Sequence, residues 1–118
     1  MDIEQIREYC LAKKETTESF PFDEHTLVFK VANKMFALLS LDSTPTSMNL
    51  KCDPDYALEL RSEYEAIKVG YHMNKKHWNT LIIKEINTDL LKNLIDHSYQ
   101  LVVKGLKKAD KLRLETEK

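Results

Sequence analysis

Two runs of β-forming residues in the first half of the chain constrain its fold more than any other feature. Residues 27–31 and 35–41 are rich in valine, leucine and phenylalanine, and only Ala32, Asn33 and Lys34 separate them. So short a connection suits a tight β-hairpin, and asparagine tolerates the positive φ that such a turn requires. We therefore expect two adjacent antiparallel strands here.

Three further strands are predicted from short apolar runs and from the alternation of apolar and polar side chains. Residues 48–53 alternate in this way, which is typical of a strand buried on one face. The alternation returns over residues 67–74, where we expect a strand bent at Gly70. Residues 78–83 supply the last predicted strand.

Three helices are predicted from capping residues and from apolar side chains at helical spacing. Asp2 is expected to begin a helix of about three turns, which ends in the polar stretch 13–18. Asp53, which a proline follows, is expected to begin the second helix. The third is expected to begin at Thr88 and to stop at Gly105.

The order of these elements is helix, three strands, helix, two strands, helix. Strands that neighbour one another, rather than alternating with helices, predict an antiparallel sheet with helices mainly on one face, an α+β fold. The 118 residues are enough for a single compact domain without disulfides or metals, and we place that domain over residues 1–118. Residues 107–118 are strongly charged and are expected to fray.

The net charge of −1 hides an uneven distribution along the chain. Residues 1–65 carry a balance of −6, and residues 66–118 carry +5. The total argues against a protein that binds nucleic acid by bulk charge. The asymmetry indicates a local binding surface in the second half.

Features of secretion and of membrane insertion are missing from this sequence. The first five residues lack the basic and apolar segments of a secretory signal, and no apolar run approaches the roughly 18 residues of a membrane span. Cys10 and Cys52 form no Cys-x-x-Cys pair and occupy apolar positions, so we expect two buried thiols. The protein is expected to be cytoplasmic, with no membrane partner.

No pattern of catalytic or metal-binding residues is recognisable. Two glycines cannot build a phosphate-binding loop, and His72 and His77 lack the partners of a metal site. His97 and Ser98 are adjacent on a helix and point in different directions, so they are not expected to act as base and nucleophile. We expect the Ser98 hydroxyl to bond back to its own helix and to let a strand approach closely. No catalytic residue, metal or cofactor is expected.

Residues 70–80 hold the densest group of recognition side chains. Two lysines, two histidines, two asparagines, a tyrosine and the only tryptophan fall within this segment. Lysines contact phosphates, asparagines read base edges and aromatic rings stack on bases. The structural alternative is that Lys75 and Lys76 form a solvated turn while Trp78 anchors the core. The residue types by themselves are compatible with both interpretations, nucleic-acid contact and a structural turn.

This segment resembles the hallmark stretch of the MmcQ/YjbR family of small bacterial proteins. The resemblance extends to Phe22 and Asp23, to a Val-x-x-Lys-Met-Phe-Ala hairpin over residues 31–37, to the strand-to-helix junction at 49–54, and to a Ser-Tyr-x-x-Val pattern that begins at Ser98. It therefore covers nearly the whole chain. Two departures are an asparagine at position 33, where the family usually has glycine, and the lack of the family's proline after Leu106.

The resemblance implies a curved antiparallel sheet of the kind called CyaY-like or double-wing, and a function as a DNA-binding protein without enzymatic activity. On this basis we expect a monomer in which Lys75 and Lys76 contact DNA phosphates. Asn74, His77 and Trp78 would add polar or stacking contacts, with Lys34 and Lys51 as weaker contributors.

The alternative is a protein- or small-molecule-interaction module with a pocket beside Trp78. A concave aromatic surface there would favour this alternative. An enzyme is the third and most distant hypothesis. It would require a cleft that holds His72 or His77 against Asp23 or Glu24.

Overall fold

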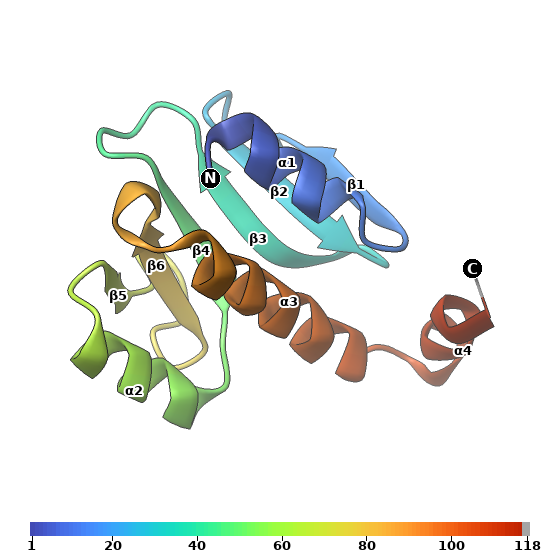
Figure 1. Ribbon diagram of the computed structural model, residues 1–118. Helices are drawn as coiled ribbons and strands as arrows, with labels where there is room; N and C mark the ends of the chain where they lie inside the picture. Colours follow the sequence, from blue (N-terminus) through green and yellow to red (C-terminus); the bar gives the residue numbers. More distant parts are fainter. Residues whose placement is uncertain (117–118) are drawn as a thin grey trace.

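Every strand pair in the structure is antiparallel, which confirms the prediction drawn from the first hairpin. The computed structural model describes residues 1–116, and its strands form one six-stranded sheet in the order β1-β2-β3-β4-β6-β5 (Figure 1). The strands are β1 (Thr16–Ser19), β2 (Thr26–Val31), β3 (Lys34–Ser40), β4 (Ser47–Lys51), β5 (Ile67–Val69) and β6 (Trp78–Ile82).

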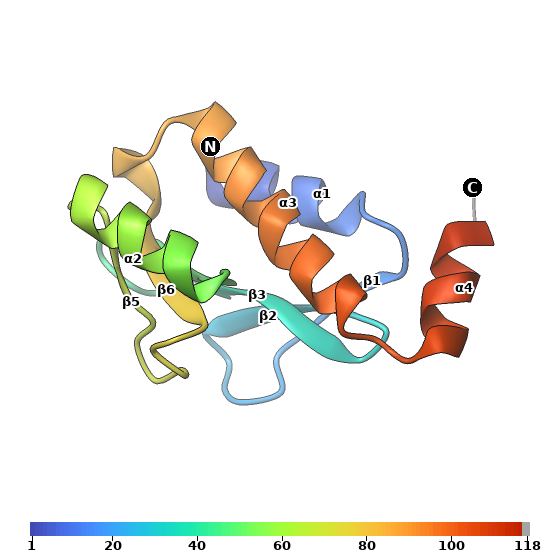
Figure 2. The same ribbon diagram turned by 90° about the horizontal axis from the view of Figure 1, so that it is seen from below.

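Within residues 1–116, helices cover one face of this sheet and leave the other face without helices (Figure 2). Figure 2 shows α1, α2 and α3 on the same side, with α4 beyond the end of α3. The α+β prediction is therefore confirmed. None of the helices in residues 1–116 has the length and apolar character that a bilayer crossing needs. The helical segments are α1 (Ile3–Leu11), α2 (Pro54–Glu63), the short 3-10 helix η1 (Ile83–Glu85), α3 (Thr88–Lys104) and α4 (Lys108–Thr116).

The β2–β3 hairpin turns where the sequence predicted. Ala32 and Asn33 both have positive φ, 46° and 70°, so Asn33 takes over the role of the glycine that the family usually has there. The register shifts after Phe29, which leaves Phe36 as an extra residue in β3. Such a bulge bends and twists the strand.

The helix ends follow local capping chemistry. Asp2 and Asp53 cap α1 and α2 as predicted. The cap of α3 is Asn87 rather than Thr88, since the Asn87 side chain accepts a hydrogen bond of 2.8 Å from the first turn. Asparagine caps at least as well as threonine, and Thr88 is the first residue of the helix proper. Gly105 ends α3 as predicted.

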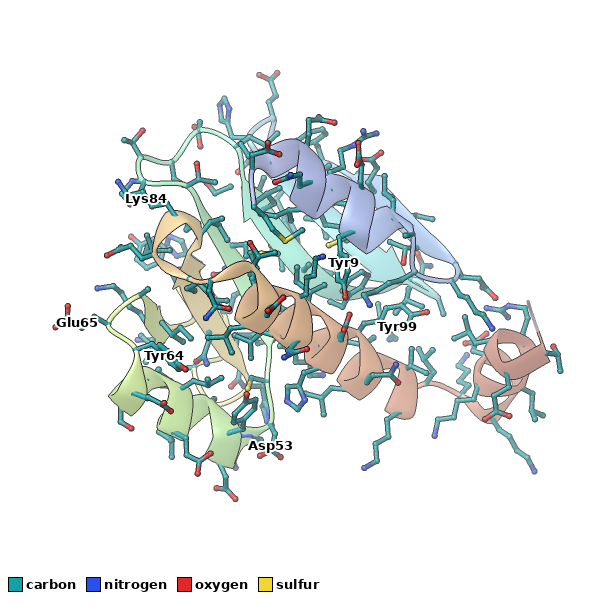
Figure 3. All side chains as sticks on the ribbon, viewed as in Figure 1. Tyr9, Asp53, Tyr64, Glu65, Lys84 and Tyr99 are labelled. Atoms are coloured by element: carbon teal, nitrogen blue, oxygen red, sulfur yellow. The ribbon has the colours of Figure 1, made fainter. Side chains whose placement is uncertain are left out.

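The main core lies between the sheet and the helices. Cys10 and Cys52 are both buried and unpaired in it, as predicted. Burial raises the pKa of the Cys10 thiol to about 12 and that of the Cys52 thiol to about 11, so both stay protonated. Figure 3 shows Tyr9 and Tyr99 in the region between α1 and α3, where the Tyr9 hydroxyl donates a hydrogen bond of 2.7 Å to Asp96.

Ser98 joins α3 to two strands. Its hydroxyl donates to the carbonyl of Phe36 at 2.5 Å and accepts from the backbone N–H of Lys51 at 2.9 Å. The predicted close approach of a strand is confirmed. The predicted bond back to the helix is wrong, because a buried serine here can satisfy sheet backbone groups beside the bulge that would otherwise lack a partner.

Two segments depart from the predicted strand pattern. The polar stretch 13–18 was expected to carry only the end of the first helix, but Thr16–Ser19 forms β1 by pairing its backbone with β2. The strand expected over residues 67–74 ends at Val69, because the chain turns and His72 adopts a φ of 62°.

The charged C-terminal segment is helical where we expected it to fray. Leu114 in α4 is buried, and Arg113 makes two hydrogen bonds of 2.7 Å to the carboxylate of Glu15. One apolar side chain and a bidentate ion pair therefore hold α4 to the rest of the domain. The expectation for residues 117–118 lies outside the described residues.

Candidate functional site

The face of the sheet opposite the helices, here called the open face, carries a continuous row of side chains. The register places Val28, Leu38, Asn49 and Thr80 side by side across β2, β3, β4 and β6. This row mixes two apolar and two polar side chains, so the open face is neither an ordinary core nor an ordinary solvated surface.

Trp78 covers one part of the open face. It is only 8% exposed and lies against a small apolar group: Val28, Leu38, Met35 and Met73. A Cβ added to Gly70 would come within 2.7 Å of the Trp78 Cβ, so the segment before β6 lies close against this residue. The structural alternative for Trp78 therefore holds. A ring buried to this depth cannot stack on a nucleic-acid base, and we remove Trp78 from the predicted contacts.

A groove opens beside this group, between two loops. Figure 2 shows the loops 20–25 and 70–77 leaving the sheet on the side away from the helices. The space between them has a volume of about 560 Å³, which is in the range of small-molecule sites. We call it the open-face groove. Its lining residues are Phe22, Asp23, Thr26, Leu38, Ser40, Ser43, Ser47, Met48, Asn49, Tyr71, His72, Met73 and Thr80.

One wall of the groove is fixed by hydrogen bonds to its floor. The backbone N–H of Tyr71 donates to the Thr80 hydroxyl at 2.9 Å, and the Asn49 side chain donates to the Tyr71 carbonyl at 3.3 Å. The Thr80 hydroxyl in turn donates to Asn49 Oδ1 at 2.5 Å. Both backbone groups of Tyr71 are thus bound, while its side chain is 70% exposed. The backbone of Tyr71 is thus fixed against β4 and β6, while the residue as a whole is open to solvent.

The opposite wall contains an aromatic residue next to a carboxylate. Phe22 is 63% exposed. Asp23 Oδ1 accepts from the backbone N–H groups of His25 and Thr26, at 2.8 and 2.7 Å. These bonds to its charged form lower the pKa of Asp23 below its usual range, so the carboxylate stays ionised at neutral pH.

The groove lining carries little charge, and its one fixed charge is negative. Among its lining residues Asp23 is the single carboxylate, and neither lysine nor arginine is present. His72 is the one basic side chain, and its ring lies 4.1 Å from the Tyr71 ring between centroids. The groove therefore lacks the fixed positive charge that an anionic ligand would need.

The predicted lysines gather elsewhere, at one end of the sheet. The antiparallel order makes β3 begin, β4 end and β6 begin at the same end. Lys34 opens β3, Lys51 closes β4, and Lys75 and Lys76 precede β6. We call these four the lysine end. Within residues 1–116 none of them takes part in an ion pair.

The other two predicted residues shape the turn before β6. Asn74 Oδ1 accepts from the backbone N–H of Lys76 at 2.9 Å, which is an Asx turn. The carbonyl of His77 accepts from the backbone N–H of Cys52 at 2.8 Å. Their local role is to hold the turn that presents the lysines.

His72 and Asp23, a pair that the enzyme hypothesis would need in one cleft, both line the open-face groove. His97 and Ser98, in contrast, are engaged in structural contacts. His97 Nε2 accepts from the backbone N–H of Asp53 at 3.2 Å, while Ser98 is bound to the sheet as described above. In the part of the chain that the structure describes, no three His, Cys, Asp or Glu side chains are grouped to hold a metal ion.

The three serines in the groove lining were missed from the sequence. Ser40 ends β3, Ser43 lies in the following loop and Ser47 begins β4, so they read as turn residues. Phe22 was noted only through the family resemblance. Two aromatic residues around a proline, exposed beside a strand, are the signal that could have drawn attention to it.

Comparison with known proteins identifies the family. The YjbR family model matches residues 11–101. The chain belongs to the YjbR family. The YbdF protein of Escherichia coli O157:H7 is 44% identical over 96 residues, which cover 80% of this chain and 79% of that protein. YjbR of Escherichia coli K12 is 29% identical over 104 residues, with 87% and 88% covered.

Solved structures similar to this chain have the same fold. The crystal structure of Deinococcus radiodurans DR2400, described by the domain name DUF419, superposes with a TM-score of 0.89 at 38% identity. It covers 98% of this chain and 88% of the other. A Pseudomonas syringae protein superposes with a TM-score of 0.75 at 27% identity, covering 86% and 98%. The α+β fold of this chain is thus shared by both solved structures.

Proposed function

We propose that this YjbR-family protein is a non-catalytic binding module that takes a small ligand into the open-face groove. The observation that carries the proposal is the groove itself: about 560 Å³, with apolar side chains and two exposed aromatic residues, Phe22 and Tyr71, in its lining. Exposed aromatic side chains cost solvation free energy unless a ligand covers them. This is the interaction-module alternative, with its concave surface beside Trp78.

The geometry also supports a non-catalytic role. The buried thiols have raised pKa values, so they are poor nucleophiles, and the Ser98 hydroxyl has its partners in the sheet. The free cysteines fit a reducing setting, and we place the protein in the cytoplasm on that ground.

The test uses Trp78 as a built-in reporter, since Leu38 and Met73 line the groove and also contact this ring. Phenol, indole and choline chloride are titrated as probes, with tryptophan emission and amide chemical shifts as readouts. We expect at least one probe to shift the resonances of Tyr71 and Phe22.

Tyr71→Ala and Phe22→Ala should weaken that binding about fivefold or more. Phe20→Ala is the matched control, because Phe20 is 48% exposed in the same connection but does not line the groove. The proposal is wrong if none of the probes perturbs the groove, or if Phe20→Ala weakens binding as much as the two groove variants do.

A second candidate function is the DNA binding that the family resemblance implied. The specific observation in its favour is the lysine end, where the strand order brings four lysines from three segments to one edge. Phosphate contacts by the lysines would make binding weaken steeply with salt.

Fluorescence anisotropy with a short labelled DNA duplex at low salt tests this candidate. Lys75→Glu/Lys76→Glu should abolish binding. Lys84→Glu/Lys104→Glu makes the same change of charge away from the open face, since Lys84 follows β6 (Figure 3) and Lys104 ends α3, and should leave binding within about twofold. Equal losses of DNA affinity in the two variants would show that binding depends on the total charge of the protein and not on the lysine end.

A further inference from the structure

We infer that the ligand of the open-face groove is a small organic cation, an alkylated ammonium compound whose charged group sits between Tyr71, Phe22 and Asp23. This inference rests on the proposed function and names the chemical class of its ligand. Three features of the lining carry it: two exposed aromatic residues from opposite loops, the fixed carboxylate of Asp23, and the lack of lysine and arginine.

The aromatic pair supplies the attraction for a cation. Phe22 and Tyr71 come from opposite loops, line the same groove and remain 63% and 70% exposed. The faces of aromatic rings attract cations, most strongly when water is excluded between them. Alkylated ammonium groups gain most from such surroundings, because their methyl groups also bury apolar area.

Asp23 supplies the formal charge. Its carboxylate follows Phe22 directly and is held by three donors: the two backbone N–H groups already described and the Thr26 hydroxyl at 3.3 Å. A carboxylate fixed in this way needs no reorganisation when a cation arrives.

The rest of the lining fits the remainder of such a ligand. Leu38 and Met73 offer apolar contacts in the lining, and the hydroxyls of Ser40 and Ser47 can accept hydrogen bonds. The lysines lie at the end of the sheet and not in the groove, so they do not compete with a bound cation. A volume of about 560 Å³ suits a free small molecule rather than a folded partner.

The experiment compares choline with its neutral isostere 3,3-dimethyl-1-butanol, followed by Trp78 emission and by the shifts of Tyr71 and Phe22. We expect choline to bind about tenfold more tightly than the isostere. Asp23→Asn should reduce this preference about fivefold or more. Glu24→Gln is the matched control: it removes the same charge one residue away, outside the groove lining, and should change binding less than about twofold.

Asp23→Asn also perturbs the turn that Asp23 caps, so Tyr71→Ala provides a second variant and should lose choline binding while keeping its fold by circular dichroism. Equal affinity for choline and the isostere would overturn the cation inference and leave the groove as a binding site. Failure of every probe to perturb the groove would instead remove the proposed function. The N-acetyl amide of trimethyllysine is tested as well. If it binds about tenfold more tightly than choline, the inference of a free small molecule is wrong, and the ligand is a modified side chain of another protein.

Discussion

Gly70 is needed where it stands because Trp78 fills the space that a side chain there would occupy. A Cβ at position 70 would lie 2.7 Å from the Trp78 Cβ and 2.8 Å from the Trp78 carbonyl oxygen. The backbone of a paired strand cannot yield by that amount without disturbing its neighbours. At Gly105 the nearest atom would be 3.7 Å away, an ordinary contact.

The two glycines therefore make a matched pair of substitutions. We predict that Gly70→Ala lowers the free energy of unfolding by about 1–3 kcal/mol, as overpacking does. Gly105→Ala should change it by less than about 1 kcal/mol, because the site is open and φ is −88°. Urea denaturation measures both. Equal effects would show that the contact between Gly70 and Trp78 is not close.

Cys10 gives a second prediction at this scale, on alkaline pH. Burial raises its thiol pKa from 9.0 to about 12 in the folded state. Above pH 9 the unfolded chain therefore loses the Cys10 proton while the folded chain keeps it. The stability from the neutral thiol is complete below pH 9 and is lost as the pH rises toward 12.

We expect Cys10→Ala to show a shallower decline in unfolding free energy over this range, by up to about 1 kcal/mol per pH unit. Urea denaturation of the wild type and the variant at a series of pH values compares the two slopes. Cys52→Ala is the comparison: its slope should change in the same way up to about pH 11, the pKa of the Cys52 thiol, and not above it. Parallel slopes for Cys10→Ala and the wild type would contradict the burial of the thiol.

At the scale of elements, the least predictable piece is α4. Its composition is charged, and one apolar side chain, Leu114, is 6% exposed against the domain while Leu112 on the same helix is 50% exposed. The Lys14 ammonium also donates to the Leu114 carbonyl at 3.2 Å. Long-range contacts, and not the intrinsic preference of the segment, thus hold this helix in place.

Leu114→Ala should lower the free energy of unfolding by about 2 kcal/mol and increase hydrogen exchange throughout α4. Leu112→Ala makes the same chemical change on the exposed side and should alter stability by less than about 0.5 kcal/mol. Exchange in α4 that is already fast in the wild-type protein would contradict the docked helix.

At the scale of the whole molecule, the sheet carries apolar groups on both faces. The main core lies under the helices, and the smaller group around Trp78 lies on the open face. The strands β2, β3 and β6 contribute to both, so neither group can come apart while the sheet stays intact. The domain should therefore unfold as one cooperative unit.

We predict that tryptophan emission, which reports the open face, and far-ultraviolet circular dichroism, which reports the helices, give the same urea midpoint in one denaturation series. Addition of a groove ligand should raise both midpoints together. A Trp78 transition that precedes the loss of helix would show that the open face is an independent, weaker layer.

The sequence by itself determined the features that depend on neighbours along the chain. Asn33 set the hairpin turn, Asp2 and Asp53 capped their helices, and the apolar positions of Cys10 and Cys52 placed them in the core. The tertiary structure alone decided the features that join distant segments. Thr16–Ser19 became a strand because β2 offered a partner, and Ser98 bonded across to the sheet instead of its own helix.

The candidate site belongs to this second class. Phe22 and Tyr71 are separated by most of the sheet's strands in sequence, and only the strand order brings their loops to the same groove. The same strand order buries Trp78 against Gly70 and leaves the nearby Lys75 and Lys76 exposed to solvent. Local patterns fix which residues form turns and strands. Which of them share a surface follows from register and packing, since these depend on every strand at once.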